Sequence, residues 1–402
     1  MLPYQIMPNA NEDKVVILCA DVSNNCLSRA ITLAEIISRD NDVQIIGFSR
    51  DGRNIWPPAT TTAIDVKALE FGWLNNWHKA RKEISSLIRH SRLIICKPRL
   101  MSMGLALFAG CDPEQVVLDI NDWELGLALE SGRADGHFNY LDLAKNPVSP
   151  NSPLLTLFFE SRIKNFPHRI VNNRWLQNRF GGELIYDVRD SDRFDPAKYD
   201  RKKSRAELGM DDRPWIVFAG TPRLHKGVKN IILALEEIQG QGAPGLLVCG
   251  GGISQEGIDE LISLSTEKLG NTRFRYIKQY DRLKLPGYLA AADIACIPSE
   301  LSSNTVGQVP TKLFEAMAMG LPVITSDVCD MKNLVEGIGL SVPPGDVKAL
   351  SAAIMSLCSR PELRMEMGNK ARLRAVNEFS YDAAQPVLQA MLSRIRSGSN
   401  LR

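Results

Sequence analysis

A chain of 402 residues exceeds what one hydrophobic core usually organises, so its length predicts two domains. The formal net charge is only +2, which gives no indication of a nucleic-acid-binding surface. Eight scattered cysteines, without paired metal-ligand spacing, are typical of reduced and buried thiols. The sequence shows neither a secretory signal nor an apolar run long enough to span a bilayer, so we expect a cytoplasmic protein.

Short apolar runs alternate with helical patterns along the whole chain. The runs cover 14–19, 43–48, 92–97, 115–120, 169–173, 215–220, 245–250, 273–278, 293–299 and 321–326. Near-continuous apolar strands joined by helices indicate parallel sheets that are covered on both faces. We therefore expect an α/β protein.

The strand pattern divides at a segment rich in charge and turn formers, residues 187–209, which resembles a linker. We expect two doubly wound, Rossmann-like domains, at 1–190 and 191–376, followed by a final helical segment at 377–402. Ligands of open parallel sheets bind beyond the carboxyl ends of the strands. The residues that directly follow each strand are therefore the candidates for function.

The first candidate segment is FAGTPRLHKG, residues 218–227, between a strand and a helix. Such a turn presents free backbone N–H groups and a helix N-terminus to an anion. Arg223 and Lys226 add two cations that suit a diphosphate. A basic, solvated loop without a ligand is the alternative interpretation.

The second candidate segment, residues 297–328, includes PTKLFEAMAMGLPVI. Pro310 and Thr311 are expected to open a helix that ends at Gly320. Glu315 follows Lys312 by about one turn and could accept hydrogen bonds from a sugar diol. An ordinary Glu–Lys surface pair is the alternative.

These segments resemble the donor-site region of the GT-B glycosyltransferases of family 4, the retaining "group 1" enzymes. PTKLFEAMAMGLPVI matches the family's P-x-K-x-x-E-A-M-A-x-G-x-P-V-I pattern, and FAGTPRLHKG matches its K-G turn. The segment that starts at RIVNNRWLQNRFGG resembles the family's interdomain segment. The resemblance implies the GT-B architecture, with a C-terminal helix that crosses back onto the first domain.

The resemblance also implies functions for single residues. Arg223 and Lys226 would grip the donor diphosphate, and Glu315 would hold the nucleotide ribose. The backbone near Lys278 and Gln279 would receive the base. The other implied donor-site residues are Gly220, Thr221, Ser303, Asn304, Gly307, Val309, Thr311 and Lys312.

The chain departs from the family pattern at two places. Gly307 stands where the first Glu of the Glu-x7-Glu motif belongs, so Ser302, Ser303 or Asn304 would have to contact the sugar. Asn24 and Asn25 stand near the place of the usual Gly-Gly loop after the first strand. Asparagine tolerates the left-handed backbone conformation that such a loop requires.

The acceptor side is expected in the first domain. Residues 116–124, VVLDINDWE, end a strand with Asp119, Asn121 and Asp122. In the family a His-Asp pair often lies there, so Asp122 or Asp119 would orient hydroxyl groups; a helix-capping carboxylate is the alternative. After another strand, Lys97 and Arg99 could meet an anion or form a solvated basic loop.

Two further signals favour structure over function. Asp190, Ser191 and Asp192 form an Asp-x-Asp sequence, the metal-binding pattern of other glycosyltransferases, but turn chemistry explains it better. Residues 78–92 form a basic helix that resembles membrane-docking helices of relatives, although a solvated face is the simpler interpretation. Peripheral contact with the inner membrane face is kept as a possibility.

The expected activity is transfer of a sugar from a UDP- or GDP-sugar to an acceptor hydroxyl, with retention, in glycan or glycoconjugate biosynthesis. Neither a metal nor another cofactor is expected. The expected partners are the donor and a glycan, lipid-linked or small-molecule acceptor, without nucleic acid. A sugar-nucleotide 2-epimerase and a non-catalytic nucleotide-binding subunit are the alternatives; sugar, base, acceptor and oligomeric state stay open.

Overall fold

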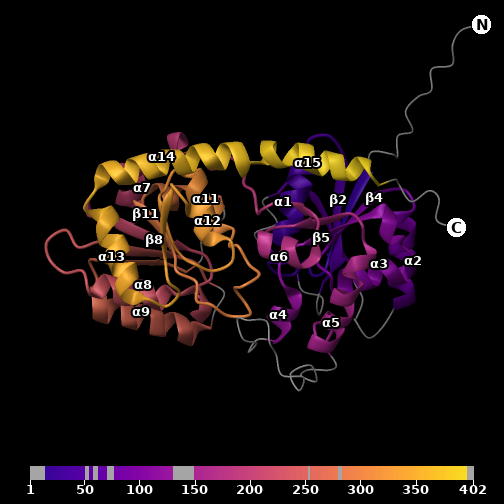
Figure 1. Cartoon of the computed structure of the whole chain (residues 1–402), viewed down its shortest axis with the longest axis horizontal. Coiled ribbons are helices and arrows are strands. Elements are labelled where there is room, and N and C mark those ends of the chain that lie inside the picture. Colours follow the sequence, from indigo (N-terminus) through magenta and orange to yellow (C-terminus); the bar gives the residue numbers. More distant parts are fainter. Residues whose placement is uncertain are drawn as a thin grey trace, which may run out of the picture.

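The computed structural model describes residues 14–49, 54–57, 62–69, 77–129, 149–251, 254–278 and 283–395. Within these residues two separate sheets form, one of seven strands and one of six, and all neighbouring strands pair in parallel. Figure 1 shows the two sheets side by side, each with its own helices. The chain therefore has two Rossmann-like α/β domains.

The first sheet has the order β3-β2-β1-β4-β5-β6-β7. Its strands are β1 (Lys14–Cys19), β2 (Asp42–Phe48), β3 (Asp65–Leu69), β4 (Arg92–Cys96), β5 (Val116–Ile120), β6 (Arg169–Val171) and β7 (Glu183–Leu184). Its helices are α1 (Leu27–Ile37), α2 (Trp77–Ile88), α3 (Leu105–Phe108), α4 (Glu124–Leu129), α5 (Pro153–Arg162) and α6 (Arg174–Phe180).

The second sheet has the order β10-β9-β8-β11-β12-β13. Its strands are β8 (Trp215–Ala219), β9 (Gly245–Cys249), β10 (Phe274–Ile277), β11 (Ile294–Ile297), β12 (Val323–Ser326) and β13 (Gly339–Val342). Its helices are α7 (Arg201–Glu207), α8 (Val228–Glu236), α9 (Gln255–Leu269), α10 (Leu285–Ala290), α11 (Lys312–Ala318), α12 (Met331–Val335), α13 (Val347–Cys358) and α14 (Pro361–Glu378).

The last described helix, α15 (Tyr381–Ser393), packs against α1 of the first domain. Figure 1 shows α14 and α15 following one another along one side of the molecule. The Tyr381 hydroxyl donates a hydrogen bond of 2.6 Å to Glu35, and Leu388 is buried in the core that α1 also lines. The chain thus returns to the domain in which it started.

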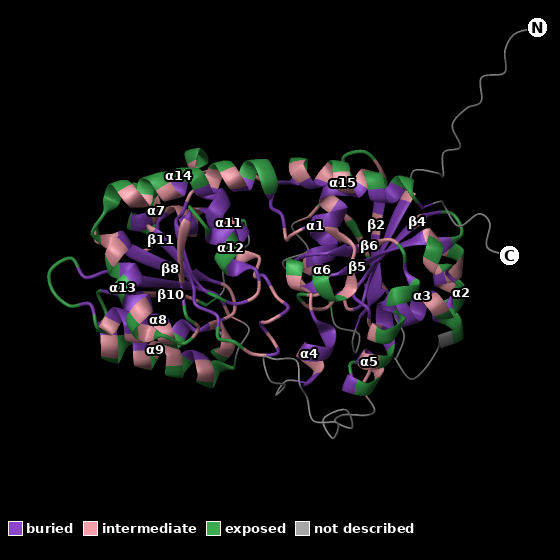
Figure 2. Cartoon of the chain, viewed as in Figure 1, coloured by how far each residue is buried: buried purple, intermediate pink, exposed green. Residues whose placement is uncertain are grey.

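Buried apolar side chains fill both faces of each sheet, as the near-continuous apolar strands predict. Figure 2 shows the strands buried and the outer surfaces of the helices exposed. The strand order reverses between β1 and β4 in the first sheet and between β8 and β11 in the second. Ligands of such sheets bind at these switch points, so the loops after these strands position the site.

Candidate donor site between the domains

The turn after β8 begins at Gly220 and leads through a single 3-10 turn into α8. Gly227, the glycine of the K-G turn, has φ 72°, and a Cβ atom there would lie 1.9 Å from the carbonyl oxygen of Pro298. Glycine is therefore required by both backbone conformation and space. The turn holds Lys226 at the N-terminus of a nine-residue helix, where backbone N–H groups favour an anion.

Three cations lie at this turn: Arg223 and Lys226 belong to it, and Lys312 reaches it from α11, with its ammonium 3.2 Å from where a Cβ of Gly220 would lie. In the described part of the chain, no salt bridge involves Arg223, Lys226 or Lys312. Burial lowers the pKa of Lys226 to about 8; Asp122 opposes this shift and Arg223 adds to it. Burial and then repulsion by Lys226 lower the pKa of Lys312 well below its usual value. An anion bound here would relieve this repulsion.

His225 in the same turn is kept neutral. Burial, followed by the charges of Lys226, Arg223 and Lys312, lowers its pKa to about 4. The imidazole therefore adds no charge at neutral pH and can serve as a hydrogen-bonding group.

Helix α11 begins at Lys312, with Thr311 at the capping position, as the sequence predicts. Gly320, after the helix, has φ 69°, which is the usual left-handed ending of a helix. The Lys312 ammonium lies 3.5 Å from the centre of the Phe218 ring. Glu315 pairs with Arg189, whose Nε is 3.1 Å from its carboxylate, so the Glu–Lys surface pair does not form. The ribose-binding function of Glu315 stays a prediction.

On the facing domain, the strand ends of β4 and β5 supply a second charged group. Lys97 lies 2.5 Å from Asp122 and 2.8 Å from Glu124, while Arg99 also pairs with Glu124. Burial would lower the pKa of Lys97, but Asp122 and Glu124 outweigh it and raise that pKa. Burial would raise the pKa of Asp122, but Lys97 and a hydrogen bond from Gln308 lower it. Lys97, Arg99 and Asp122 are therefore charged, and the solvated-loop interpretation of Lys97 is wrong.

Gln308 joins the two halves of the site. Its Oε1 accepts a hydrogen bond of 2.5 Å from Lys226, and its Nε2 donates one of 2.8 Å to Asp122. Sequence reasoning brought Lys226 and Asp122 to the same cleft but missed Gln308, because an uncharged amide in a loop carries no pattern. It also missed Glu124, which completes the first-domain group.

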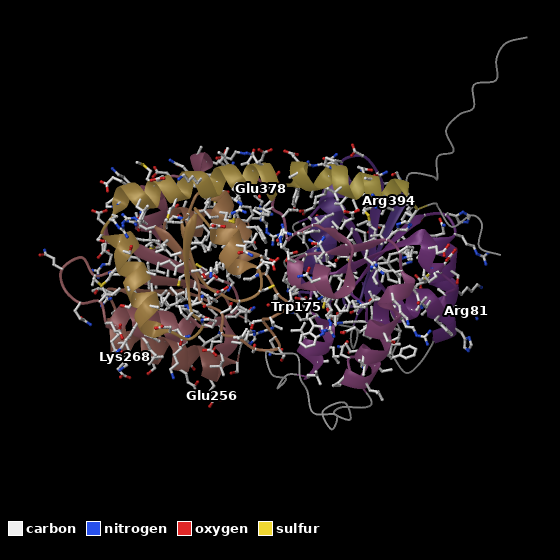
Figure 3. The ribbon with its side chains drawn as sticks, viewed as in Figure 1. Arg81, Trp175, Glu256, Lys268, Glu378 and Arg394 are labelled. Carbon is white, nitrogen blue, oxygen red and sulfur yellow. The ribbon has the colours of Figure 1, made fainter. Side chains whose placement is uncertain are left out.

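Gly307 packs against the first domain. A Cβ atom there would lie 2.8 Å from the Cβ of Trp123 and 3.1 Å from the Trp175 ring. The guanidinium of Arg179 lies over both tryptophan rings. Figure 3 labels Trp175 on the first domain, where it faces the second. The space that a glutamate side chain would need at position 307 is thus occupied by the two tryptophans of the first domain.

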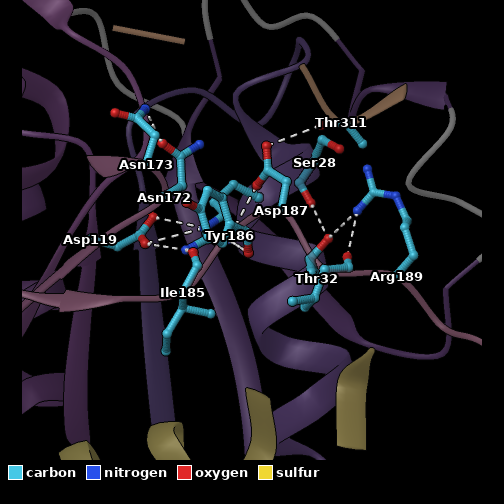
Figure 4. A network of polar contacts seen from close by, with 12 residues as sticks. Ser28, Thr32, Asp119, Asn172, Asn173, Ile185, Tyr186, Asp187, Arg189 and Thr311 are labelled. Carbon is cyan, nitrogen blue, oxygen red and sulfur yellow. Dashed lines mark hydrogen bonds and ion pairs between the residues drawn. The ribbon is translucent and has the colours of Figure 1, made fainter. Parts of the chain in front are cut away.

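Asp119 does not belong to the exposed part of the site. Its carboxylate is fully buried and lies 3.0 Å from Arg29, which also binds Asp187 and the carbonyl oxygen of Ile185. Figure 4 shows these contacts extending through Asp187 to Thr311, with the Thr32–Arg189 hydrogen bond nearby. As part of β5, Asp119 faces α1, whereas Asp122 follows the strand and faces the second domain. The expectation that Asp119 orients a substrate is therefore corrected: it holds the first domain together.

The loop after β1 also differs from expectation. Asn24 and Asn25 precede α1 without a left-handed backbone; among the described residues other than glycine, only Lys97 and Cys329 have positive φ. Asn24 instead donates a 2.6 Å hydrogen bond to Asp21 and accepts one from the Cys26 backbone. The strained backbone conformation lies at Lys97, where φ is 73°.

The remaining predicted residues of the donor and acceptor sides lie in different environments. The Ser303 hydroxyl and the Asn121 carbonyl are buried without a hydrogen-bond partner in the described structure, as expected of groups that await a ligand. Thr311 donates to Asp187, and the Gln308 N–H, expected near the diphosphate, donates to Thr305. Lys278 is exposed and its side chain contacts Gln255, while Gln279 lies outside the described residues. Asn304 is half-buried, and the Val309 side chain is buried.

The two segments that were set aside adopt ordinary structures. Asp190 accepts hydrogen bonds from the backbone of Asp192 and Arg193, as in a turn. In α2, Ala80, Ile84 and Ile88 are buried and the basic side chains lie outside. Among the described residues no helix is long and apolar enough to cross a membrane, and no cluster of three metal-ligating side chains occurs.

Two sheets of this topology, with the site at their switch points, define the GT-B fold. The fold agrees with solved structures: HepE of Anabaena, in complex with UDP and glucose, superimposes with a TM-score of 0.71 at 17% identity, covering 95% of this chain and all of that one. Residues 200–374 match the family "Glycosyl transferases group 1". The protein thus has the GT-B fold, and its second domain is similar to the group 1 glycosyl transferases over residues 200–374.

Curated relatives are more similar but match over shorter lengths. The alpha-D-kanosaminyltransferase of Streptomyces kanamyceticus is 28% identical over 219 residues, which cover 51% of this chain and 52% of that protein. A GDP-mannose-dependent monoacylated phosphatidylinositol monomannoside mannosyltransferase of Corynebacterium glutamicum is 29% identical over 201 residues, 48% and 51% of the two chains. The chain thus spans about half the length of the relatives it matches.

Proposed function

We propose that the protein is a retaining, metal-independent glycosyltransferase that moves a sugar from a nucleotide diphosphate sugar to an acceptor hydroxyl. The observation that carries the proposal is the group of three cations, Arg223, Lys226 and Lys312, at the β8 turn. None of them has a carboxylate partner within the described residues, and two are held at a lowered pKa. A nucleoside diphosphate supplies the missing charge.

The same cations explain how the reaction is promoted. As the glycosidic bond to the donor breaks, negative charge builds up on the leaving diphosphate. Lys226 and the backbone N–H groups at the start of α8 are already oriented toward that charge, which is electrostatic stabilisation by a preorganised site. They supply the positive charge that a divalent cation supplies elsewhere, so a metal is not needed.

The acceptor side is the facing group around Asp122. Its carboxylate is ionised and oriented by Lys97, so it can accept a hydrogen bond from an acceptor or sugar hydroxyl. We place the sugar next to Trp123 and the buried Ser303 hydroxyl. Retention follows from front-face transfer, in which the donor phosphate takes the acceptor proton.

Release of nucleotide from UDP-glucose and GDP-mannose, measured with EDTA present, tests this proposal. We expect release by the wild type and a loss of about 10²-fold in Lys226→Ala, because one preorganised donor of charge stabilisation is removed. Lys229→Ala changes an exposed lysine three residues along the chain and should leave release unchanged. The anomeric configuration of the product, followed by NMR, reports retention.

Two other outcomes would replace the proposal. Interconversion of the sugar without release of nucleotide would identify an epimerase. Nucleotide binding that Lys226→Ala abolishes, without turnover of any donor, would identify a binding subunit.

A further inference from the structure

The Gln308 side chain is the polar contact that connects the donor cations to the acceptor-side carboxylate. Lys226 and Gln308 belong to the second domain, whereas Asp122 follows β5 of the first. The hydrogen bonds of 2.5 Å to Lys226 and 2.8 Å to Asp122 use both ends of one amide. The bridge therefore crosses from one domain to the other.

A side-chain amide suits this bridge, because its acceptor and its donors lie on separate atoms. The Lys226 ammonium can only donate and the ionised Asp122 carboxylate can only accept, so the connecting group must offer one acceptor and one donor. A carboxylate at 308 would satisfy Lys226 but repel Asp122. An apolar side chain would remove one hydrogen-bond partner from each of the two half-buried charges, Lys226 and Asp122.

The first-domain end of the bridge is held in place. The second oxygen of Asp122 accepts from Lys97, which also binds Glu124, and Glu124 binds Arg99. Lys97 is 4% exposed and adopts a left-handed backbone that its neighbours must stabilise. Charges alternate along this series, so each group fixes the next.

The neighbouring Gly307 explains why the bridge matters. Position 307 has no side chain that could reach across the interface, and Trp123 and Trp175 occupy the space. The Gly307 carbonyl accepts a hydrogen bond from Asn173 of the first domain, and the adjacent Gln308 supplies the side-chain contact to Asp122. The ammonium of Lys226 has three donors, so one can stay on Gln308 while the others bind a diphosphate.

We propose that Gln308 is a positioning residue, which holds the Lys226 ammonium in a fixed place relative to the Asp122 carboxylate and so aligns the donor with the acceptor side. The expected kinetic effect rests on the proposed function, whereas the hydrogen-bonded bridge itself does not. Its effect should fall on the reacting complex more than on donor binding, because alignment errors of about 1 Å can cost 10²-fold in rate.

The first test is kinetic. In Gln308→Met and Gln308→Glu, we expect kcat for nucleotide release from the donor to fall at least about tenfold, while KM for the donor changes less than about threefold. In an Asp122→Ala background, Gln308→Met should cost much less, because the two side chains act as a unit. Changes confined to KM, or kcat values within twofold of wild type, would overturn the proposal.

Gln385 provides a matched control. Its amide also joins a cation and a carboxylate, Arg39 and Asp40, but on α15, away from the strand ends. Gln385→Met should therefore leave kcat and KM unchanged. An equal loss of kcat in both Met variants would show a general loss of structure and would count against positioning.

The second test needs no turnover. The rate at which acetic anhydride labels Lys226, followed by mass spectrometry over pH, reports the state of its ammonium. The charged or titratable groups that act on Lys226 are Asp122 and Arg223, together with His225 in the same turn and Lys312 at the start of α11. We expect Gln308→Glu to raise the labelling midpoint and Gln385→Met to leave it unchanged.

The two tests separate the two claims. If Gln308→Glu shifts the labelling midpoint but the wild type releases no nucleotide from any donor, the bridge is supported and the proposed function is refuted. An unchanged midpoint in Gln308→Glu would overturn the bridge, whatever the enzyme does.

Discussion

Lys226 illustrates how a site can be prepared for an anion before the anion arrives. Burial lowers its pKa to about 8, so at slightly alkaline pH part of the population is neutral. A bound diphosphate favours the ammonium and raises this pKa. Binding must therefore be coupled to protonation.

This coupling fixes the sign of the pH dependence. Nucleotide affinity should be fully developed below pH about 8 and fall as the pH rises from there toward the pKa of the complex, with proton uptake across that window. Calorimetry with UDP or GDP at pH about 8.5, in two buffers of different ionisation enthalpy, measures the uptake. Lys226→Ala should remove it; an unchanged uptake in that variant would assign the proton elsewhere.

Gly307 provides a second prediction for a single residue. In Gly307→Ala the new Cβ lies 2.8 Å from Trp123, closer than real contacts allow, so the domains must shift. We expect a loss of about 1–3 kcal/mol in the free energy of unfolding, as for other overpacked sites. Gly287→Ala, in α10, meets nothing closer than 3.7 Å and should stabilise by about 0.5–1 kcal/mol. Denaturant unfolding of both variants checks the contrast.

The sequence distinguishes some of these residues and not others. The K-G turn and the Glu315 helix carry patterns of spacing, and the structure brings their cations together as expected. Asp119 and Asp122 could not be separated in advance, since a strand that is apolar on both faces gives no sign of where a carboxylate points. Nothing in the sequence around Gln308 indicates that its amide spans two domains.

At the scale of elements, Arg29 fastens α1 to β5 and to the segment after β7. It binds Asp119, Asp187 and the carbonyl oxygens of Ile185 and Tyr186, and its side chain is 2% exposed. Arg29→Met would leave the buried Asp119 without its counter-charge. We expect a loss of about 3–5 kcal/mol in the free energy of unfolding.

Arg39, just after α1, supplies the comparison. It pairs with Asp382 on the surface, where ion pairs contribute less than about 1 kcal/mol. Arg39→Met should therefore change the unfolding midpoint little, as measured by denaturant titration. Equal effects of the two substitutions would show that burial does not increase the contribution of the Arg29 ion pair to the free energy of unfolding.

At this scale, the more distinct the sequence pattern of an element is, the more accurately the element is predicted. The long apolar runs all appear as strands, but β3, β7 and β13 were missed. β7 has only two residues, and the three lie at or near sheet edges, where a continuous apolar run is not required. The segment 187–209, expected as a linker, contains α7, which packs against α10. Most of the charged residues of α7 are exposed, although Arg205 is buried and pairs with Asp293, so composition alone suggested a loop.

At the scale of the whole molecule, α15 makes the first domain depend on a distant segment of the chain. Leu388 is 1% exposed and lies in the core shared with α1. Leu388→Ala should destabilise the first domain by about 2–5 kcal/mol through the cavity it leaves. Calorimetry with a bound nucleotide, which stabilises the second domain, would separate the two transitions.

Leu373→Ala is the control for this prediction. Leu373 belongs to α14 and is 63% exposed, so its truncation should change neither transition appreciably. A shift of the second-domain transition by Leu388→Ala would contradict the assignment of α15 to the first domain's core.

The return of α15 also has a consequence for biosynthesis. The ribosome delivers β1 to β7 long before residues 381–395, so the face of the first sheet that α1 shares with α15 stays open while the entire second domain is made. Domains usually fold in the order of synthesis, but here the second domain can finish first. A nascent chain halted before Tyr381 would expose this apolar face and should recruit chaperones or aggregate.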